Sequence, residues 1–466
     1  MGAIMSEVTL TFLGATDTVT GSRFLISTSE SKVLVDCGLF QGTKEIKSKN
    51  WEPFPVDIDT LDGVILTHAH LDHSGYLPLL VRDGYKKKIH ATHYTKEIAK
   101  IILLDSAHLQ ELDAKFAGEK KYSEHPQPKP LYNTKDAQDA IELFSEHPFR
   151  TLVQVAKDIS VTFYPSGHIL GSSFVEVNAS GKKILFTSDL GRNNHPLLSN
   201  PDAPPTLDVD IVVTESTYGN RVHDSSQESF ASEINQAMKR GGKILIPAFA
   251  VDRTEVILMA LHKLIEENKI PQIPIYVDSP MAIRALALYR DAVANDSLEI
   301  RDGVSKKWEN QDPFNAGSLK QLESTEDSKT LKLIEGTGII LSASGMSSGG
   351  RVVHHLKNLL PDPSNTVILV GFQAAGTRGR LLEEGVARVK IHGDWVSVNA
   401  HISKIESFSV HADSDELVKW LSQVNKPSKT FIVHGEADSQ LAMKNRLHDE
   451  LGWNTIIPKS HKIYDL

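Results

Sequence analysis

The chain has 466 residues, of which 40% are hydrophobic and 23% charged, the composition of an ordinary globular protein. Two domains are expected, because single hydrophobic cores seldom grow past roughly 250–300 residues. The net charge of −9 excludes a protein that holds nucleic acid by bulk positive charge, so a nucleic acid would have to bind in a local groove. Residues 342–411 are locally basic, with seven Lys or Arg against five Asp or Glu.

Membrane and secretory features are absent from the sequence. No apolar stretch reaches the ~18 residues of a membrane-spanning helix, so no membrane partner is expected. The N-terminal residues lack the basic start and apolar centre of a secretory signal. Cys37 is the single cysteine and cannot form an internal disulfide. Together these features predict a cytoplasmic protein.

The N-terminal half is predicted to consist mainly of short strands separated by turns. Helical spacing occurs at Leu77–Arg82 and Thr95–Leu112, whereas residues 113–133 are rich in Lys and Pro and are predicted to form an exposed loop. The expected strands are residues 8–13, 23–27, 32–36, 61–67, 160–164, 173–178, 183–187 and 210–214.

The pattern changes after Tyr218, where strands begin to alternate with helices. Such alternation predicts βαβ units around a parallel sheet. Beyond about residue 395 we expect two strand–loop–helix pieces, the first helix opening at a capping box that begins with Asp413. The expected strands are 243–249, 274–277, 405–409 and 429–433, and the expected helices are 228–240, 254–268, 413 onward and 439–451.

The strongest chemical signal is the segment His68-Ala-His70-Leu-Asp72-His73, which directly follows the strand predicted at 61–67. Imidazole nitrogens and carboxylate oxygens are ligands that suit Zn²⁺. Four such groups within six residues can point into one small volume. An exposed His-rich turn is the alternative, but it does not account for the buried strand that leads into the segment.

This HxHxDH loop resembles the hallmark of the metallo-β-lactamase superfamily, and the other parts of the family pattern occur in order. Asp36 lies in VLVDCG, His168 in PSGHILGSS and Asp189 in ILFTSDLG. Asp36 ends a strand and alone could be a turn aspartate. His168 and Asp189 alone would be ambiguous, but both follow apolar runs and precede glycine-containing turns. The resemblance implies an αββα sandwich with metals at one edge of its two sheets.

The resemblance also implies two Zn²⁺ per chain, with Mn²⁺ as the alternative metal. The first set of ligands would be His68, His70, His168 and Asp189, and the second would be Asp72, His73, the shared Asp189 and one further histidine. Asp36 would accept a hydrogen bond that orients a ligand histidine.

Later motifs resemble the β-CASP subgroup of nucleases, in which an extra domain interrupts the lactamase fold. Glu215 lies in TESTYG, which matches motif A; His411 lies in SFSVHAD, which matches motif B; His434 lies in FIVHGE, which matches motif C. Histidine in motif C is typical of RNA-processing members, whereas DNA-repair members usually have valine. The resemblance covers nearly the whole chain and includes PAFAVDRTEVIL and SASGMSSGGR.

The implied fold class is α/β: an αββα metallo-β-lactamase sandwich with an inserted β-CASP α/β domain of the parallel-sheet type. We expect residues 1–218 to form the first part of the lactamase domain and residues 396–466 its C-terminal part. Residues 219–395 would form the inserted domain.

Phosphodiester hydrolysis explains the need for these residues. Paired cations lower the pKa of a shared water and neutralise charge on the phosphate, and Asp189 can fix their spacing, with Asp72 beside it. The resemblance implies that His411 is the general acid, that Glu215 orients it, and that His434 completes the second metal site. The alternatives are that His411 only neighbours a helix cap and that Glu215 is an ordinary carboxylate at a sheet end.

A glycine-rich segment, residues 344–351, offers backbone N–H groups that can bind anions, and a helix expected near Arg351 would add its dipole. The candidate contacts to RNA phosphates are Gly345, Ser347, Gly349 and Gly350, together with Arg378 and Arg380 in GTRGR. A plain loop and structural arginines are the alternatives.

The sequence therefore predicts a zinc-dependent ribonuclease that hydrolyses single-stranded RNA through a two-zinc-activated hydroxide and leaves 5′-phosphate and 3′-hydroxyl ends. RNA is the expected partner. The sequence does not decide whether the chain forms a homodimer, or whether it acts as an endonuclease or a 5′→3′ exonuclease. The alternatives are a small-molecule (thio)ester or lactone hydrolase of the same superfamily and a catalytically silent RNA-binding subunit.

Overall fold

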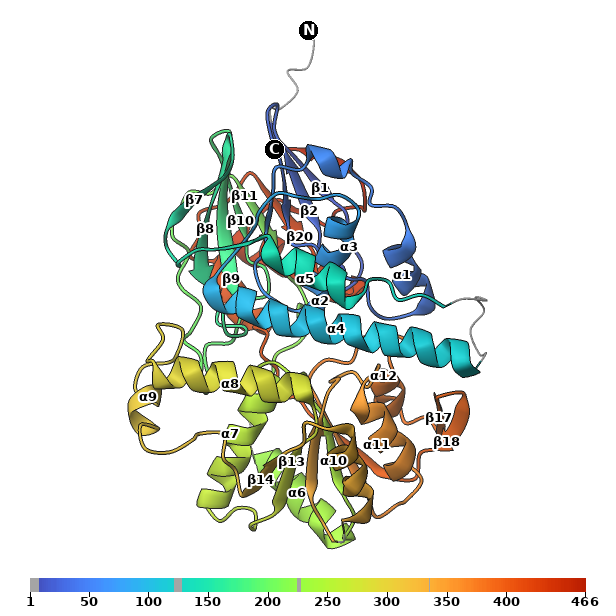
Figure 1. Ribbon diagram of the computed structural model, residues 1–466. Coiled ribbons are helices and arrows are strands. Elements are labelled where there is room, and N and C mark those ends of the chain that lie inside the picture. Colours follow the sequence, from blue (N-terminus) through green and yellow to red (C-terminus); the bar gives the residue numbers. More distant parts are fainter. Residues whose placement is uncertain (1–7, 121–127, 224–227, 335) are drawn as a thin grey trace. The chain divides into compact units, whose positions relative to one another are not determined.

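The computed structural model describes residues 8–120, 128–223, 228–334 and 336–466, and the chain divides into two compact units (Figure 1). The first unit is Met1–Val222 with Val410–Leu466, and the second is His223–Ser409. The sequence predicts these divisions after residues 218 and 395. The later second division follows from β19 (His401–Ile405), which pairs with β16 (Thr366–Val370) in the sheet of the second unit.

The first unit contains two seven-stranded sheets. In each sheet, three neighbouring strand pairs are antiparallel and three are parallel. The first sheet has the order β22 (Ile463–Asp465), β1 (Thr9–Phe12), β2 (Phe24–Ser27), β3 (Lys32–Val35), β4 (Gly63–Ile65), β5 (Ile89–Ala91) and β6 (Phe144–Glu146). The second has the order β21 (Thr455–Ile456), β20 (Lys429–Ile432), β11 (Ile211–Thr214), β10 (Lys182–Phe186), β9 (Ser173–Ala179), β8 (Ile159–Pro165) and β7 (Leu152–Ala156).

The main core of the first unit lies between these two sheets. Alternate residues of the strands point inward, so Leu10 and Phe12 of one sheet and Val161 and Phe163 of the other belong to a single core, and all four are fully buried. Phe431 of β20 packs against Phe12, with ring centroids 4.9 Å apart. Removal of this apolar surface from water is the main force that holds the sheets together.

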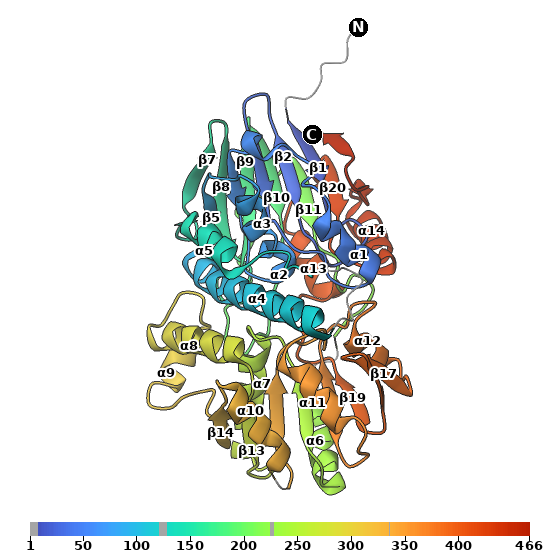
Figure 2. The ribbon, with the colours of Figure 1, turned by 45° about the vertical axis from the view of Figure 1, so that its right-hand side comes forward.

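Helices cover the outer faces of both sheets. Leu417 and Leu421 of α13 (Ser414–Leu421) and Met443 and Leu447 of α14 (Ala437–Leu451) pack on the second sheet (Figure 2). The helices α3 (Leu77–Arg82), α4 (His93–Lys120) and α5 (Thr134–Glu142) lie over the first sheet (Figure 1). The short helices α1 (Lys44–Ser48) and α2 (Leu71–Ser74) belong to its connecting loops. This arrangement confirms the predicted αββα sandwich.

Two predictions of local secondary structure were wrong, one in the first part of the lactamase domain and one near the end of the inserted domain. Residues 113–120, predicted to be loop, continue α4, because their Ala, Lys and Glu residues favour a helix; residues 121–127 lie outside the described residues. The strand expected at 405–409 is instead β19, which ends at Ile405 and is followed by a turn.

The second unit is built on a six-stranded sheet whose strands are all parallel, as the alternation of strands and helices predicted. Its order is β14 (Ser318–Gln321), β13 (Pro274–Val277), β15 (Ile339–Ser342), β12 (Ile244–Pro247), β16 and β19. Its helices are α6 (Glu228–Arg240), α7 (Arg253–Glu266), α8 (Pro280–Ala294), α9 (Val304–Lys307), α10 (Thr325–Thr330), α11 (Arg351–Leu359) and α12 (Arg378–Glu383).

A separate hairpin of β17 (Arg388–Ile391) and β18 (Asp394–Ser397) completes the second unit. Val389, Ile391 and Val396 join the core that α11 and α12 form on one face of the parallel sheet. Among helices within the described ranges, none combines the length and apolar character that a membrane crossing requires.

We expect Phe431→Ala to lower the free energy of unfolding by about 3–5 kcal/mol, because it leaves a cavity between the two sheets. Urea unfolding followed by circular dichroism would measure the change. Leu441→Ala removes an exposed leucine of α14 and should stay within about 0.5 kcal/mol of the parent. Equal losses from both substitutions would contradict this account of the core.

Candidate metal centre

Loops at one edge of the sandwich bring the chemical groups of the first unit together. His68 follows β4, Asp189 follows β10 and His434 follows β20, while His168 lies in the connection between β8 and β9. The carboxyl ends of neighbouring parallel strands meet at the same edge of a sheet, which is where ligands bind in open α/β folds. Residues separated by hundreds of positions in the sequence therefore become neighbours.

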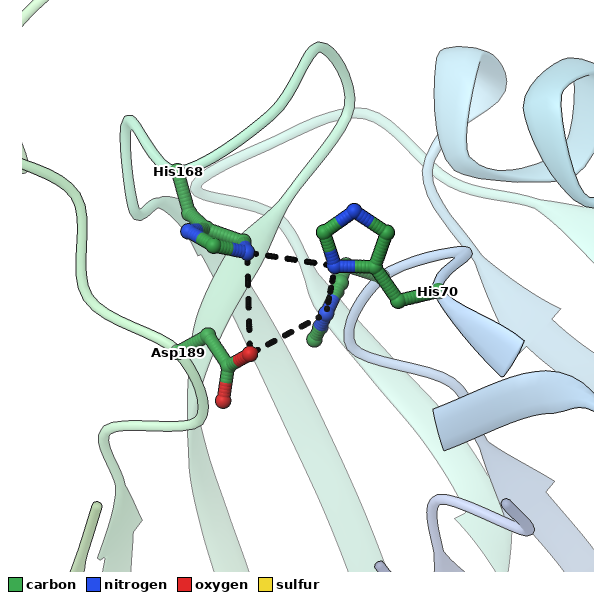
Figure 3. Close-up of side chains that lie close together, drawn as sticks. His70, His168 and Asp189 are labelled. Carbon is green, nitrogen blue, oxygen red and sulfur yellow. Dashed lines mark hydrogen bonds and ion pairs between the residues drawn. The ribbon is translucent and has the colours of Figure 1, made fainter. Parts of the chain in front are cut away.

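The first group consists of His68, His70, His168 and Asp189. The Nδ1 atom of His70 lies 3.2 Å from Nε2 of His68 and 3.2 Å from Nε2 of His168. The Oδ2 atom of Asp189 lies 3.4 Å from Nε2 of His68 and 3.6 Å from Nε2 of His168. Figure 3 shows His70, His168 and Asp189 pointing toward one another from separate segments.

These distances fit a tetrahedral set of zinc ligands. Ligands at about 2.0–2.1 Å from zinc define a tetrahedron with edges of roughly 3.3–3.4 Å. The four distances above scatter around that value, and three imidazole nitrogens with one carboxylate oxygen are donors that zinc accepts. All the atoms lie within 4.8 Å of one another.

The second group consists of Asp72, His73 and His434. The Nε2 atom of His434 lies 3.2 Å from Nε2 of His73 and 3.5 Å from Oδ2 of Asp72. Oδ1 of Asp189 lies 3.4 Å from Nε2 of His73, so the two oxygens of Asp189 face different groups. Within the described part of the chain, Oδ1 of Asp189 is buried and makes no hydrogen bond, which suits an oxygen that binds a cation.

Asp36 lies behind the second group, where the sequence analysis expected a carboxylate that orients a ligand histidine. Its Oδ2 is 2.8 Å from Nδ1 of His73, so that Nδ1–H can donate and leave Nε2 directed at Asp72 and His434. Asp36 itself accepts hydrogen bonds from the backbone N–H and the hydroxyl of Thr67, at 2.8 and 3.0 Å. The carboxylate is thereby fixed between two loops.

Burial keeps most of these histidines neutral, the form that binds a metal. It lowers the pKa of His68 and of His168 well below 6.5 and that of His70 to about 4. His73 differs: burial acts in the same direction, but the carboxylates of Asp189 and Asp36 outweigh it and raise its pKa well above 6.5. The buried carboxylates therefore require positive charge at this place, and a metal cation would provide it.

His411 and Glu215 form a third group with Asp189. Nδ1 of His411 lies 3.3 Å from Oε2 of Glu215, and the backbone N–H of Leu190 donates to Oε1 of Glu215 at 2.6 Å. Burial lowers the pKa of His411, but Glu215 and Asp189 outweigh it, and the net effect is a pKa above 6.5. Glu215 is therefore held by the backbone and contacts the imidazole that motif B contributes.

Three supporting groups were missed by the sequence analysis. The Thr217 hydroxyl lies 3.1 Å from Nδ1 of His434, and the backbone carbonyl of Val410 lies 3.5 Å from Nδ1 of His168. The Ser188 hydroxyl lies 3.4 Å from Nδ1 of His68. Thr217 lies within TESTYG and Ser188 within ILFTSDLG, so both carried a weak signal, but a backbone carbonyl has no sequence signal.

The predicted phosphate contacts lie together in the second unit, on the loop between β15 and α11 and at the start of α12. Gly345 is buried and packs on Phe249, and the buried hydroxyl of Ser347 has no hydrogen-bond partner among the described residues. Gly349 has open space around it, and Gly350 has a φ of 76° and precedes α11.

The two candidate arginines are both held by this part of the second unit. Arg378 donates through Nη1 to the carbonyl of Ser347, and Arg380 makes an ion pair with Glu384 at 2.8 Å. Arg378 therefore joins the glycine-rich loop to the start of α12, although each arginine already has a structural contact.

Comparison with known families agrees with this geometry. Residues 17–248 match the Metallo-beta-lactamase superfamily, residues 254–382 match the Beta-Casp domain, and residues 395–458 match the Zn-dependent metallo-hydrolase RNA specificity domain. The chain belongs to the metallo-β-lactamase superfamily, in the group that carries the Beta-Casp domain and the RNA specificity domain.

Similar proteins include a ribonuclease, an RNase J-like protein and a transcription termination factor. The chain is 36% identical to Ribonuclease TTHA0252 of Thermus thermophilus, with 92% of this chain and 94% of that protein covered. It is 32% identical to the RNase J-like protein of Methanocaldococcus jannaschii (97% and 98% covered) and 31% identical to Transcription termination factor FttA of Thermococcus kodakarensis (97% and 70% covered).

Among solved structures, a protein of unknown function from Enterococcus faecalis V583 shares the fold. Its TM-score is 0.52 at 14% identity, with 98% of this chain and 100% of that chain covered.

We expect Asp36→Asn to weaken zinc binding about 10- to 100-fold, because the amide no longer offers a carboxylate to Nδ1–H of His73. Competition with a chromogenic chelator would measure the affinity. Asp59→Asn, at an exposed aspartate, is the matched control and should leave the affinity unchanged. Unchanged zinc affinity of Asp36→Asn would show that this contact does not support the site.

Proposed function

We propose that this chain is a zinc-dependent ribonuclease that hydrolyses phosphodiester bonds of single-stranded RNA. The observation that carries the proposal is the convergence of two His/Asp groups around Asp189, with His411 and Glu215 beside them. The match of residues 395–458 to the RNA specificity domain supports RNA as the substrate. The matched segment includes both His411 and His434. The names of the ribonuclease relatives point the same way.

Two zinc ions per chain suit the two groups. His68, His70, His168 and Asp189 would hold one ion, and Asp72, His73, His434 and Asp189 would hold the other. Bound zinc would supply an activated water and neutralise charge on the phosphate. Asp189, with its oxygens directed at the separate groups, fixes their spacing, and Asp36 fixes the orientation of His73.

His411 is proposed as the general acid. The departing sugar oxygen needs a proton, and Nε2 of His411 lies on the side of the imidazole opposite the Glu215 contact, 4.0 Å from Oδ2 of Asp189. Glu215 accepts from Nδ1–H and stabilises the protonated ring. Because the backbone N–H of Leu190 holds the other oxygen of Glu215, the pair is positioned before substrate binds.

The rival functions account for less of the structure. A small-molecule hydrolase needs the metal ligands but gives no role to the all-parallel second unit or to the His411–Glu215 pair. A silent RNA-binding subunit would not need the full set of seven clustered ligand side chains.

Metal removal provides the first test. We expect the purified chain to cut end-labelled single-stranded RNA, to lose activity with chelator and to regain it with zinc. Asp72→Asn/Asp189→Asn should lower the rate by more than about 10³-fold, since both metal sites lose a carboxylate. Matched DNA should be cut far more slowly than RNA, and the exposed variant Asp59→Asn should match the parent. RNA cleavage that survives complete metal stripping would refute the proposal.

His411→Ala should lower kcat about 10²- to 10⁴-fold with little change in KM, because the leaving oxygen loses its proton donor. Glu215→Gln should move the descending limb of the kcat–pH profile to lower pH. The sign follows from the charges: Glu215 raises the pKa of His411, the protonated form is the active one, and removal of the carboxylate lowers that pKa. A limb that stays in place or moves to higher pH would exclude His411 as the acid.

A further inference from the structure

The hairpin of β17 and β18 in the second unit carries an exposed aromatic and basic face that the proposed mechanism does not use. Val389, Ile391 and Val396 are buried, and the other residues of the two strands are exposed, including the consecutive Asp394 and Trp395 of β18. The outer face presents Arg388, Lys390, Trp395 and Ser397.

Trp395 is the distinctive residue of this face. Its side chain is 62% exposed, whereas Trp308, Trp420 and Trp453 are buried. Lys390 stands directly opposite Trp395 across the hairpin, and the guanidinium carbon of Arg388 lies 5.0 Å from the centroid of the indole ring. An aromatic ring is thus presented to solvent with one cation over it and another beside it.

The charge of the hairpin favours an anionic ligand. Asp394 is its single acidic residue, and that carboxylate pairs with Nζ of Lys357 at 2.6 Å. Arg388 and Lys390 are exposed and lie on the same face as Trp395. A surface with an open aromatic ring and flanking cations suits single-stranded nucleic acid, in which each base has a stacking face and each linkage carries a phosphate.

The hairpin is also continuous with the candidate phosphate-binding loop. Nε of Arg378 donates to the carbonyl of Lys390 at 3.3 Å, while Nη1 of the same arginine donates to the carbonyl of Ser347. One guanidinium therefore joins strand β17 to the glycine-rich loop within the second unit. RNA phosphates bound along that loop would place neighbouring nucleotides next to the hairpin.

We propose that the outer face of the β17–β18 hairpin binds single-stranded RNA, with a base stacked on Trp395 and phosphates contacted by Arg388 and Lys390. The proposal rests on the proposed ribonuclease function for the identity of the ligand. Stacking accepts every base, so this surface would add affinity for longer RNA without sequence preference.

Binding of a fluorescently labelled, uridine-rich RNA of about 20 nucleotides, measured by anisotropy, tests the proposal. All variants carry Asp189→Asn so that the RNA stays intact, and zinc is present throughout. Trp395→Ala should weaken binding about 5- to 100-fold, the range for loss of one stacked base. Trp395→Phe, which keeps an aromatic ring, should retain most of the affinity, and Lys390→Ala should reduce the salt dependence by about one phosphate contact.

Two controls make the result specific to base stacking. Trp51 is also 62% exposed but lies outside the hairpin and in the other unit, so Trp51→Ala should leave RNA affinity unchanged. An abasic oligomer of the same length keeps the phosphates but has no bases, so Trp395→Ala should not weaken its binding. Cleavage by the chain with Asp189 intact tests the ribonuclease function separately, and either result can fail without the other.

The proposal is overturned if Trp395→Ala binds the long RNA within twofold of its parent. It is equally overturned if the abasic oligomer loses affinity in parallel, since the ring would then not act through bases. A third contrary outcome is an altered oligomeric state of Trp395→Ala in analytical ultracentrifugation with unchanged RNA affinity, which would identify the face as a contact between proteins.

Discussion

The first unit depends on holding three carboxylates, two of them buried and one partly buried, within reach of one another. Asp36, Asp72 and Asp189 lie close to the same set of histidines, and the charge of Asp189 is felt by His68, His73 and His411. Uncompensated buried charges of this kind would cost several kcal/mol each, so the arrangement is stable only with positive charge between them. The raised pKa of His73 has the same cause, because a proton on its imidazole partly compensates the negative charge of the carboxylates. Zinc would compensate this negative charge more completely and would bind the histidines that burial keeps neutral.

The fold meets this constraint by placing the loops at one edge and leaving the core to the strands. The inward faces of the two sheets are almost wholly apolar, and the polar groups begin only where the strands end. Asp36 has a φ of 57° and His434 a φ of 52°, backbone conformations that turn each side chain out of its strand direction. Such conformations are costly for residues other than glycine and persist where the surroundings hold them. Gly38 meets a different constraint: the backbone of the metal-ligand loop passes so close that a Cβ at this position would lie 1.6 Å from the carbonyl oxygen of Asp72.

The sequence predicted which side chains lie close together better than it predicted element boundaries. His68, His168, Asp189 and His434 could be assigned because each stands at the end of a strand with apolar alternation and within a recognisable motif. The helix at residues 113–120 was missed because lysines and nearby prolines were read as loop, although Lys, Ala and Glu are good helix formers. Residues 405–409 were read as a strand, but pairing of β19 with β16 decides where that strand ends, and such long-range pairing is not visible in local pattern. The carbonyl of Val410 could not be predicted at all, because it acts through the backbone.

The net charge of −9 raises the question of how such a chain could hold a polyanion. Many carboxylates are paired with a nearby basic side chain. At Asp278, for example, the two oxygens accept hydrogen bonds from Arg351 and His355 at 2.7 and 2.6 Å. Positive groups instead gather in one stretch of the second unit, where Arg378 connects the glycine-rich loop to the hairpin that carries Lys390. Because screening limits charge effects to about 8–10 Å at physiological salt, the local distribution governs binding rather than the total. Zinc at the metal centre and the basic residues of this stretch would therefore supply, locally, the positive charge that the proposed RNA substrate needs.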